Sequence, residues 1–125
     1  MLNYSTVGSN RLPEAVAFYD ALLGTLGMRN FFDHPSGGKL YGIRDKCLFG
    51  VLGAYDGQPA TPGNGAMAGF GLDSREAVAA FHAKALELGA TNEGDPGLRG
   101  PDGSTAYFAY FRDLDGNKLC AYKMG

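Results

Sequence analysis

The order of the predicted elements repeats along this chain, and this repeat limits the possible folds more than any other feature. A strand, a helix and three short strands are predicted over residues 2–53, and the same order returns over residues 66–123. The two helices begin roughly 60 residues apart, as expected of two similar units that share one core. The pattern predicts an α+β protein of two βαβββ units, although a ferredoxin-like domain would produce much the same alternation.

The first helix is predicted over residues 13–26. Either Ser9 or Asn10 can cap it, Pro13 suits its first turn and Gly27 ends it. Its apolar residues recur at intervals of three and four, which predicts one buried face: Ala15, Val16, Phe18, Tyr19, Leu22, Leu23 and Leu26. The strands of this unit are predicted at residues 2–8, 28–33, 39–44 and 47–53, with glycine-containing turns between them.

The second unit carries the clearer helix. Asp73 or Ser74 caps it, Gly89 ends it, and its apolar face is formed by Val78, Phe81, Ala85 and Leu88. Strands are predicted at residues 66–72, 91–93, 105–112 and 118–123, and residues 113–117 form the last hairpin turn. Residues 94–103 are rich in glycine and proline and are predicted to form an irregular loop, which could act as a lid.

The composition is that of an ordinary globular protein and excludes several partners. With a formal charge of −2 and eleven scattered basic residues, the chain lacks the cluster of Lys and Arg that nucleic-acid binding requires. No apolar run approaches the roughly 18 residues that span a bilayer, and the N-terminus lacks a secretory pattern. Cys47 and Cys120 lie far apart in the sequence, without the close spacing of a zinc or redox motif. They are therefore expected to be free thiols in a reducing compartment. We therefore expect a cytoplasmic protein with no nucleic-acid or membrane partner.

Three segments carry a family resemblance. These are AVAFYDALLGTLG at residues 15–27, DSREAVAAFHAKALELGA at residues 73–90 and YFRDLDGNKLCA at residues 110–121. Together, in this order, they resemble the vicinal-oxygen-chelate superfamily of glyoxalases, bleomycin resistance proteins and ring-cleaving dioxygenases. The connection DGQPATPGNG at residues 56–65 is similar to that of an uncharacterised subgroup of glyoxalase-like proteins.

The resemblance implies a glyoxalase/bleomycin resistance fold, in which two βαβββ units form a curved, partly closed eight-stranded mixed sheet with the helices outside. It implies one domain over residues 1–125, made of a first unit (1–53), a connection (54–65) and a second unit (66–125). In this superfamily the first and last strands of each unit hold a divalent metal through His and Glu. The equivalent positions here are Tyr4, Phe49 or Val51, Met67 and Cys120, and none of these side chains suits such an ion. We expect no metal and no other cofactor.

The same strands are expected to line a ligand pocket. Residues i and i+2 share a face of a strand, so Tyr4 lies with Thr6, and Cys120 lies with Lys118 and Tyr122. Half of the aromatic segment 107–111 must also face the pocket, and Arg99 could bind a carboxylate from the predicted lid. The pocket candidates are Tyr4, Thr6, Phe49, Met67, Arg99, Tyr107, Cys120 and Tyr122.

The remaining polar candidates have ordinary structural explanations. His82 lies in the middle of the second helix and is expected to be partly exposed, and His34 lies in a solvated turn. Arg112 precedes the last turn and can tie down the hairpin, and Arg44 is another arginine able to bind a carboxylate. Cys120 is either a buried structural thiol or part of the pocket wall.

Three roles follow for such a chain. The expected role is metal-independent binding of a small organic ligand, as in bleomycin resistance proteins. The alternative is a metal-dependent lyase or isomerase of the lactoylglutathione lyase kind, which requires either that the strands lie at other residues than predicted or that His34 or Glu93 reaches the site. Within the metal-dependent alternative, a dioxygenase is disfavoured. Its iron needs two His and one carboxylate, and one of the only two His here lies on a helix. The third role is structural, and a homodimer, with or without exchange of units, fits each of them.

Overall fold

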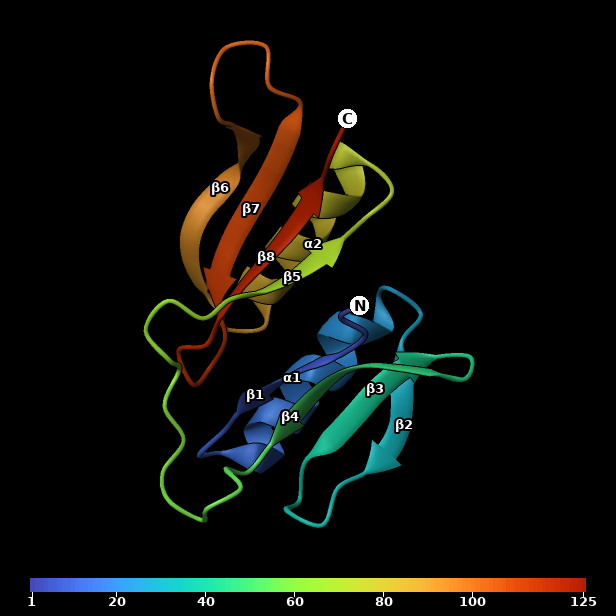
Figure 1. Cartoon of the computed structure of the whole chain (residues 1–125), viewed down its shortest axis with the longest axis vertical. Coiled ribbons are helices and arrows are strands. Elements are labelled where there is room, and N and C mark those ends of the chain that lie inside the picture. Colours follow the sequence, from blue (N-terminus) through green and yellow to red (C-terminus); the bar gives the residue numbers. More distant parts are fainter. The chain divides into compact units, whose positions relative to one another are not determined.

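The computed structural model describes all 125 residues and contains two helices and eight strands (Figure 1). The chain divides into two compact units, residues 1–64 and 65–125. Each unit has the order strand, helix, strand, strand, strand, which confirms the predicted α+β fold of two βαβββ units. The four strands of each unit form their own open sheet of mixed direction, so the expected single, partly closed sheet of eight strands is wrong. Neither helix is long and apolar enough to cross a membrane.

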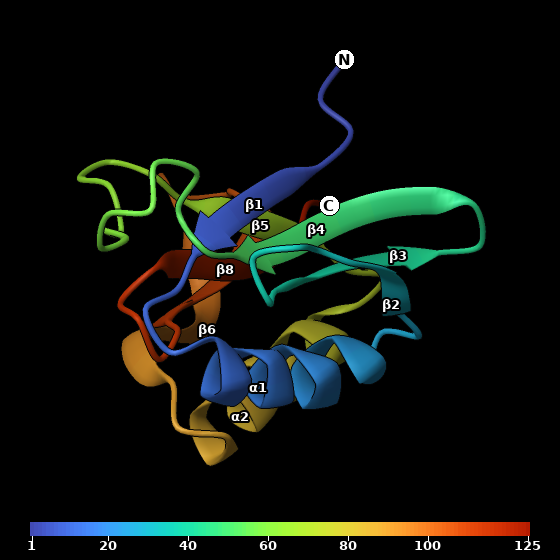
Figure 2. The ribbon, with the colours of Figure 1, turned by 90° about the horizontal axis from the view of Figure 1, so that it is seen from below.

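The first unit packs one helix on a four-stranded sheet. Its elements are β1 (Ser5–Gly8), α1 (Leu12–Gly24), β2 (Arg29–Asp33), β3 (Lys39–Ile43) and β4 (Lys46–Leu52). The strands lie in the order β1-β4-β3-β2, with β1 parallel to β4 and the other pairs antiparallel. Helix α1 runs along one face of this sheet (Figure 2), and the rings of Tyr19 and Phe49 meet there at 5.0 Å between centroids. Most of the predicted apolar face of α1 is confirmed, since Ala15, Phe18, Tyr19, Leu22 and Leu23 are buried. Val16 and Leu26 are only partly buried.

The second unit has the same plan. Its elements are β5 (Ala68–Gly71), α2 (Arg75–Glu87), β6 (Thr91–Arg99), β7 (Ala106–Arg112) and β8 (Lys118–Lys123). The strands lie in the order β5-β8-β7-β6, and β5 is parallel to β8. Phe81 of α2 packs against Phe70 and Phe111 of the sheet, with ring centroids 5.4 and 6.1 Å away. This aromatic contact forms the centre of the unit's core.

Both helices end as the sequence predicts. Gly27 and Gly89 have φ angles of +78° and +107°, which a residue with a side chain adopts only with strain. The backbone N–H of the next residue then bonds to the carbonyl five residues back, from Met28 to Leu23 and from Ala90 to Ala85. This is the Schellman arrangement that satisfies the last carbonyls of a helix.

The start of α2 is predicted correctly and that of α1 is not. Ser74 caps α2, since its hydroxyl accepts the N–H of Ala77 at 3.0 Å. The N-cap of α1 is Arg11, with no side-chain cap. Ser9 instead accepts the N–H of Arg11, and the amide of Asn10 bonds to both backbone groups of Ala60. These bonds hold part of the predicted connection, residues 54–65, against the first unit.

Strand β6 is longer than predicted, so the expected loop over residues 94–103 is largely wrong. The strand continues to Arg99 along β7 with two breaks in register, one between Asn92 and Gly94 and one between Gly94 and Gly97. An edge strand tolerates glycine and proline at such irregularities because its outer side makes no ladder bonds. The lid hypothesis for Arg99 loses its basis, because this arginine lies at the end of a strand.

The last hairpin forms as predicted and is closed by a buried carboxylate. Asp113 is 5% exposed, and its Oδ1 accepts the backbone N–H groups of Asp115 and Asn117, each at 2.9 Å. Its Oδ2 accepts the side-chain amide of Asn117 at 2.9 Å. The turn sets the register of β7 against β8, pairing Arg112 with Lys118.

Candidate functional site

The sheet of the second unit has two chemically different faces. Ala109 and Phe111 of β7 face α2, and both are fully buried. Their neighbours Phe108, Tyr110 and Arg112 lie on the opposite face, because side chains alternate along a strand. We call this the distal face, defined as the face of the second sheet turned away from α2. Pairing with β8 adds Lys118, Cys120 and Tyr122 to it.

Three aromatic rings form a stack on the distal face. The ring of Phe108 lies 5.8 Å from that of Tyr110 and 5.2 Å from that of Tyr122, with interplanar angles of 15° in both cases. Gly71 of strand β5 lets the Tyr122 ring lie close to that strand. A Cβ at this position would lie only 3.1 Å from the Tyr122 hydroxyl oxygen. The result is a half-buried aromatic surface on which a flat organic group could stack.

Two cations lie against one ring of this stack. The guanidinium carbon of Arg99 is 5.4 Å from the centroid of the Tyr110 ring, and the Nζ of Lys118 is 5.3 Å from it. Both distances are within the range of cation–π attraction. The distal face therefore combines an aromatic surface with two positive charges.

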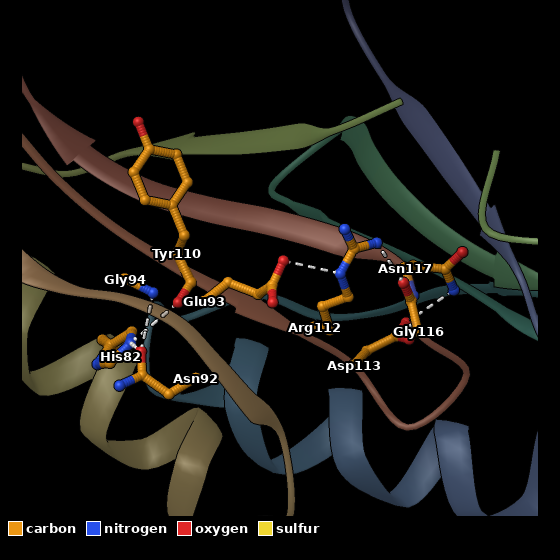
Figure 3. Close-up of polar contacts among 9 residues, drawn as sticks. All are labelled: His82, Asn92, Glu93, Gly94, Tyr110, Arg112, Asp113, Gly116 and Asn117. Atoms are coloured by element: carbon orange, nitrogen blue, oxygen red, sulfur yellow. Dashed lines mark hydrogen bonds and ion pairs between the residues drawn. The ribbon is translucent and has the colours of Figure 1, made fainter. Parts of the chain in front are cut away.

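A third cation of the distal face is neutralised within the unit. Arg112 donates from Nε to Glu93 at 2.9 Å and from Nη1 to the carbonyl oxygen of Gly116 at 2.9 Å (Figure 3). Arg112 therefore holds down the hairpin, which is one of its two predicted roles, and it also ties β6 to the last turn. Glu93 already balances the charge of Arg112. The same ion pair occupies Glu93, which is one of the residues that the lyase alternative could use.

His82 is a buried support for the site, and its predicted partial exposure is wrong. The residue is 3% exposed, and its Nε2 lies 3.1 Å from both Asn92 Oδ1 and the carbonyl oxygen of Tyr110. Both partners are acceptors, so Nε2 carries the proton and donates to them. Figure 3 shows His82 on the side of α2 and the Tyr110 ring pointing to the other side of the sheet. The histidine thus holds Tyr110 and the first irregularity of β6 from behind.

Cys120 lies on the distal face but is almost completely buried, with 2% of its surface exposed. Burial raises the pKa of this thiol, and the nearby Lys118 charge offsets part of the rise. Less of the reactive thiolate is present at neutral pH than in an ordinary cysteine, which argues against a nucleophile. Cys47 also has its pKa raised by burial, but its side chain is partly exposed.

We expect iodoacetamide at pH 7.5 to modify Cys47 before Cys120 in the folded protein. Both pKa values are raised, so both reactions should accelerate as the pH rises, and the greater burial of Cys120 should keep it the slower of the two. Peptide mass spectrometry over time measures each rate. A Cys47→Ser variant isolates Cys120, and alkylation of that variant as fast as free cysteine would contradict the assignment.

The first unit places its candidates differently from the prediction. Phe49 faces α1 and is 2% exposed, and Val51 on the same face is fully buried. Tyr41 also faces α1, where its hydroxyl donates to Asp20 at 2.8 Å, and burial with this contact raises the pKa of the tyrosine. Thr6 and Gly50 lie on the other face of this sheet. In β4 it is therefore Gly50, one residue after Phe49, that shares a face with Thr6.

The eight predicted pocket residues therefore separate into groups. Arg99, Cys120 and Tyr122 come together on the distal face of the second unit, whereas Tyr107 lies on the α2 side, with the Arg75 guanidinium carbon 5.2 Å from its ring centroid. Tyr4 and Met67 stand just before β1 and β5 and are 55% and 51% exposed. Thr6 and Phe49 lie in the first unit, on opposite faces of its sheet.

Three residues of the distal face were missed as site candidates: Phe108, Tyr110 and Lys118. The sequence contains a pattern that identifies the two aromatic residues, namely their distance from the last hairpin turn. The turn at residues 113–117 pairs Tyr110 with Cys120 and Phe108 with Tyr122, and Cys120 and Tyr122 were already assigned to the pocket side. Counting back from the turn selects Phe108 and Tyr110 rather than Tyr107.

The positions at which the superfamily holds its metal do not fit a divalent ion here. Phe49 and Val51 point into the core of the first unit, and the remaining positions offer a phenol, a thioether and a buried thiol with a raised pKa. No group of three or more His, Cys, Asp or Glu side chains is arranged to hold a metal ion. His34 bonds to Ser36 in its own turn, with its Nδ1 3.0 Å from the Ser36 hydroxyl.

A solved structure resembles this chain over its full length. A glyoxalase/bleomycin resistance protein from Albidiferax ferrireducens T118 is 41% identical, and the match covers 100% of this chain and 99% of that chain with a TM-score of 0.86. The chain belongs to the glyoxalase/bleomycin resistance protein family. This confirms the resemblance to the vicinal-oxygen-chelate superfamily.

More distant structures share the fold of this glyoxalase/bleomycin resistance protein. A lactoylglutathione lyase from Agrobacterium tumefaciens is 18% identical with a TM-score of 0.69, and the match covers 98% of this chain and 92% of that chain. The fosfomycin resistance protein FosX from Listeria monocytogenes is 16% identical with a TM-score of 0.69, covering 100% and 93% of the two chains. At these identities the likeness concerns the fold alone. No family model and no curated protein matches the chain.

Proposed function

We propose that this member of the glyoxalase/bleomycin resistance family binds a small organic ligand on the distal face of its second unit, without a metal ion. The observation that carries the proposal is the aromatic stack of Phe108, Tyr110 and Tyr122 beside Arg99 and Lys118. Binding sites for small molecules combine apolar and aromatic surface with a few placed polar groups. The distal face has this composition.

The donor set argues for binding over metal-dependent lyase or isomerase chemistry. A metal that polarises a carbonyl needs His or carboxylate ligands, and a proton transfer needs a base near the substrate. Glu93 is paired with Arg112, His82 is buried behind the sheet, and Cys120 is held as a thiol. These residues therefore do not support assigning to this chain the lyase activity for which the Agrobacterium protein is named.

A thermal-shift screen in the presence of a chelator tests the proposed function. We expect at least one class of small organic compound to raise the unfolding temperature equally with and without excess EDTA, because a ligand that binds only the folded protein stabilises it by mass action. Stabilisation that disappears with EDTA would contradict metal-free binding. A broad set of neutral and charged compounds that produces no shift would contradict ligand binding itself.

We further propose that the two units form one domain and that the protein assembles as a cytoplasmic homodimer. The edge strand β2 supports association, because its unpaired side exposes backbone groups beside Phe31 and Phe32, which are 43% and 55% exposed. The free thiols of Cys47 and Cys120 suit a reducing compartment. Light scattering distinguishes the dimer, and a monomeric mass would contradict it.

A further inference from the structure

The charges of the distal face are not balanced. Of its three cations, Arg112 pairs with Glu93, whereas Arg99 and Lys118 form no ion pair with any carboxylate of the chain. Both of these side chains are only partly exposed, and both lie against the Tyr110 ring. A partly buried cation is stabilised by a negative partner, and the chain supplies none for this pair.

The position of Arg99 depends on two glycines in its own strand. A Cβ at Gly94 would lie 3.2 Å from Nη2 of Arg99 and 2.9 Å from Cδ2 of Tyr110, and a Cβ at Gly97 would lie 3.2 Å from Nη1. The guanidinium therefore occupies space that side chains at these positions would fill. Its Nη2 donates to the carbonyl oxygen of Asp95 at 2.7 Å, which anchors the group beside Tyr110.

The aromatic partner is also fixed before any ligand binds. His82 bonds to the Tyr110 carbonyl from the core side, and the Tyr110 ring stacks on Phe108. Arg99 reaches this ring from β6 and Lys118 reaches it from β8, on the two strands that flank β7. Two positive charges from separate strands thus lie over one ring that hydrogen bonding and stacking already hold in place, which leaves little ordering for a ligand to impose.

We infer that Arg99 and Lys118 bind the negative group of a small aromatic carboxylate, whose ring lies against the stack of Phe108 and Tyr122. The inference rests on the proposed function, because it names the class of ligand for the same face. A guanidinium binds a carboxylate through two parallel hydrogen bonds, and an ammonium adds a mobile charge. The stacked rings provide the matching flat apolar surface.

Benzoate is the probe that tests this inference, and benzamide is its neutral counterpart of nearly the same shape. We expect benzoate to shift amide signals of β7 and β8 in an NMR titration at constant ionic strength. Benzamide should bind at least about tenfold more weakly, because it offers no charge to Arg99 and Lys118. Cyclohexanecarboxylate keeps the charge but lacks the flat ring, and should bind less tightly than benzoate.

Charge-removing variants assign the effect to the two cations. Arg99→Gln and Lys118→Gln should each weaken benzoate binding by about tenfold. Arg75→Gln is the matched control, because Arg75 lies over Tyr107 in a similar geometry but on the α2 side of the sheet. It should change benzoate affinity by less than about twofold. Unchanged amide spectra away from the site show that each variant is folded.

The outcomes separate this inference from the proposed function. Benzamide binding as tightly as benzoate, or an equal loss in the Arg75→Gln variant, would overturn the anion site. If neutral compounds stabilise the protein in EDTA while benzoate produces no shift, the anion site is overturned and metal-free binding stands. If no compound of either charge binds, both are overturned.

Discussion

Replacing Phe111 by alanine is expected to lower the free energy of unfolding by about 3–5 kcal/mol. Phe111 is fully buried on the α2 side of β7, where its ring packs against Phe81. Its loss removes apolar burial and leaves a cavity that the helix and sheet can fill only in part. Denaturation in urea, followed by circular dichroism, measures the change.

Phe108→Ala is the matched control for this variant. Phe108 lies three residues earlier on the same strand but on the distal face, and it is only half buried. Its removal should cost about 1 kcal/mol, because the ring stacks on Tyr110 and Tyr122 outside the core. Benzoate binding should weaken in Phe108→Ala. Equal destabilisation by the two variants would contradict the assignment of the two faces of β7.

Replacing His82 by alanine is expected to cost about 2–4 kcal/mol. The variant loses the Nε2 donor that satisfies Asn92 and the Tyr110 carbonyl, and it leaves a cavity between α2 and the sheet. Because these bonds also hold Tyr110, benzoate binding should weaken although His82 is a positioning residue that does not touch the distal face. Urea denaturation and the NMR titration measure the two effects.

His34→Ala provides the comparison for the other histidine of the chain. The side chain of His34 bonds only to Ser36 in an exposed turn, so its loss should cost less than about 1 kcal/mol and leave binding unchanged. A His82→Ala variant as stable as His34→Ala would show that the buried network does not support the fold. If His82→Ala loses the expected stability but binds benzoate as tightly as the unaltered protein, the buried network does not position Tyr110.

The sequence predicts the elements well wherever periodicity and capping agree. Both Schellman ends form at glycines that follow an apolar helical face, and the turn at residues 113–117 carries its own closing carboxylate in Asp113. Strand β6 was predicted to end at residue 93 because the glycine and proline residues that follow predict a loop when read locally. The partner strand β7 decides the outcome, since its length allows pairing to continue across two irregularities. Such tertiary context is not visible in a short window.

The candidate site was predicted only in part, for a similar reason. A shift of one residue moves a side chain to the other face of a strand. Phe49 and Tyr107, predicted to face away from the helices, lie on the helix side of their sheets, whereas Tyr122 lies on the distal face. His82 could not be recognised as buried, because its partners Asn92 and Tyr110 lie 10 and 28 residues away in sequence. The unbalanced charges of Arg99 and Lys118 likewise emerge only when β6, β7 and β8 are side by side.

The metal content of the purified protein tests metal-free binding most directly. The protein would be purified without added metal or chelator, incubated with nickel, zinc, manganese or iron(II), desalted and measured by elemental analysis. We predict less than about a tenth of an equivalent of each metal, because the available donors cannot form a divalent site. One equivalent of any of these metals retained after desalting would contradict this account and restore the metal-dependent lyase or isomerase.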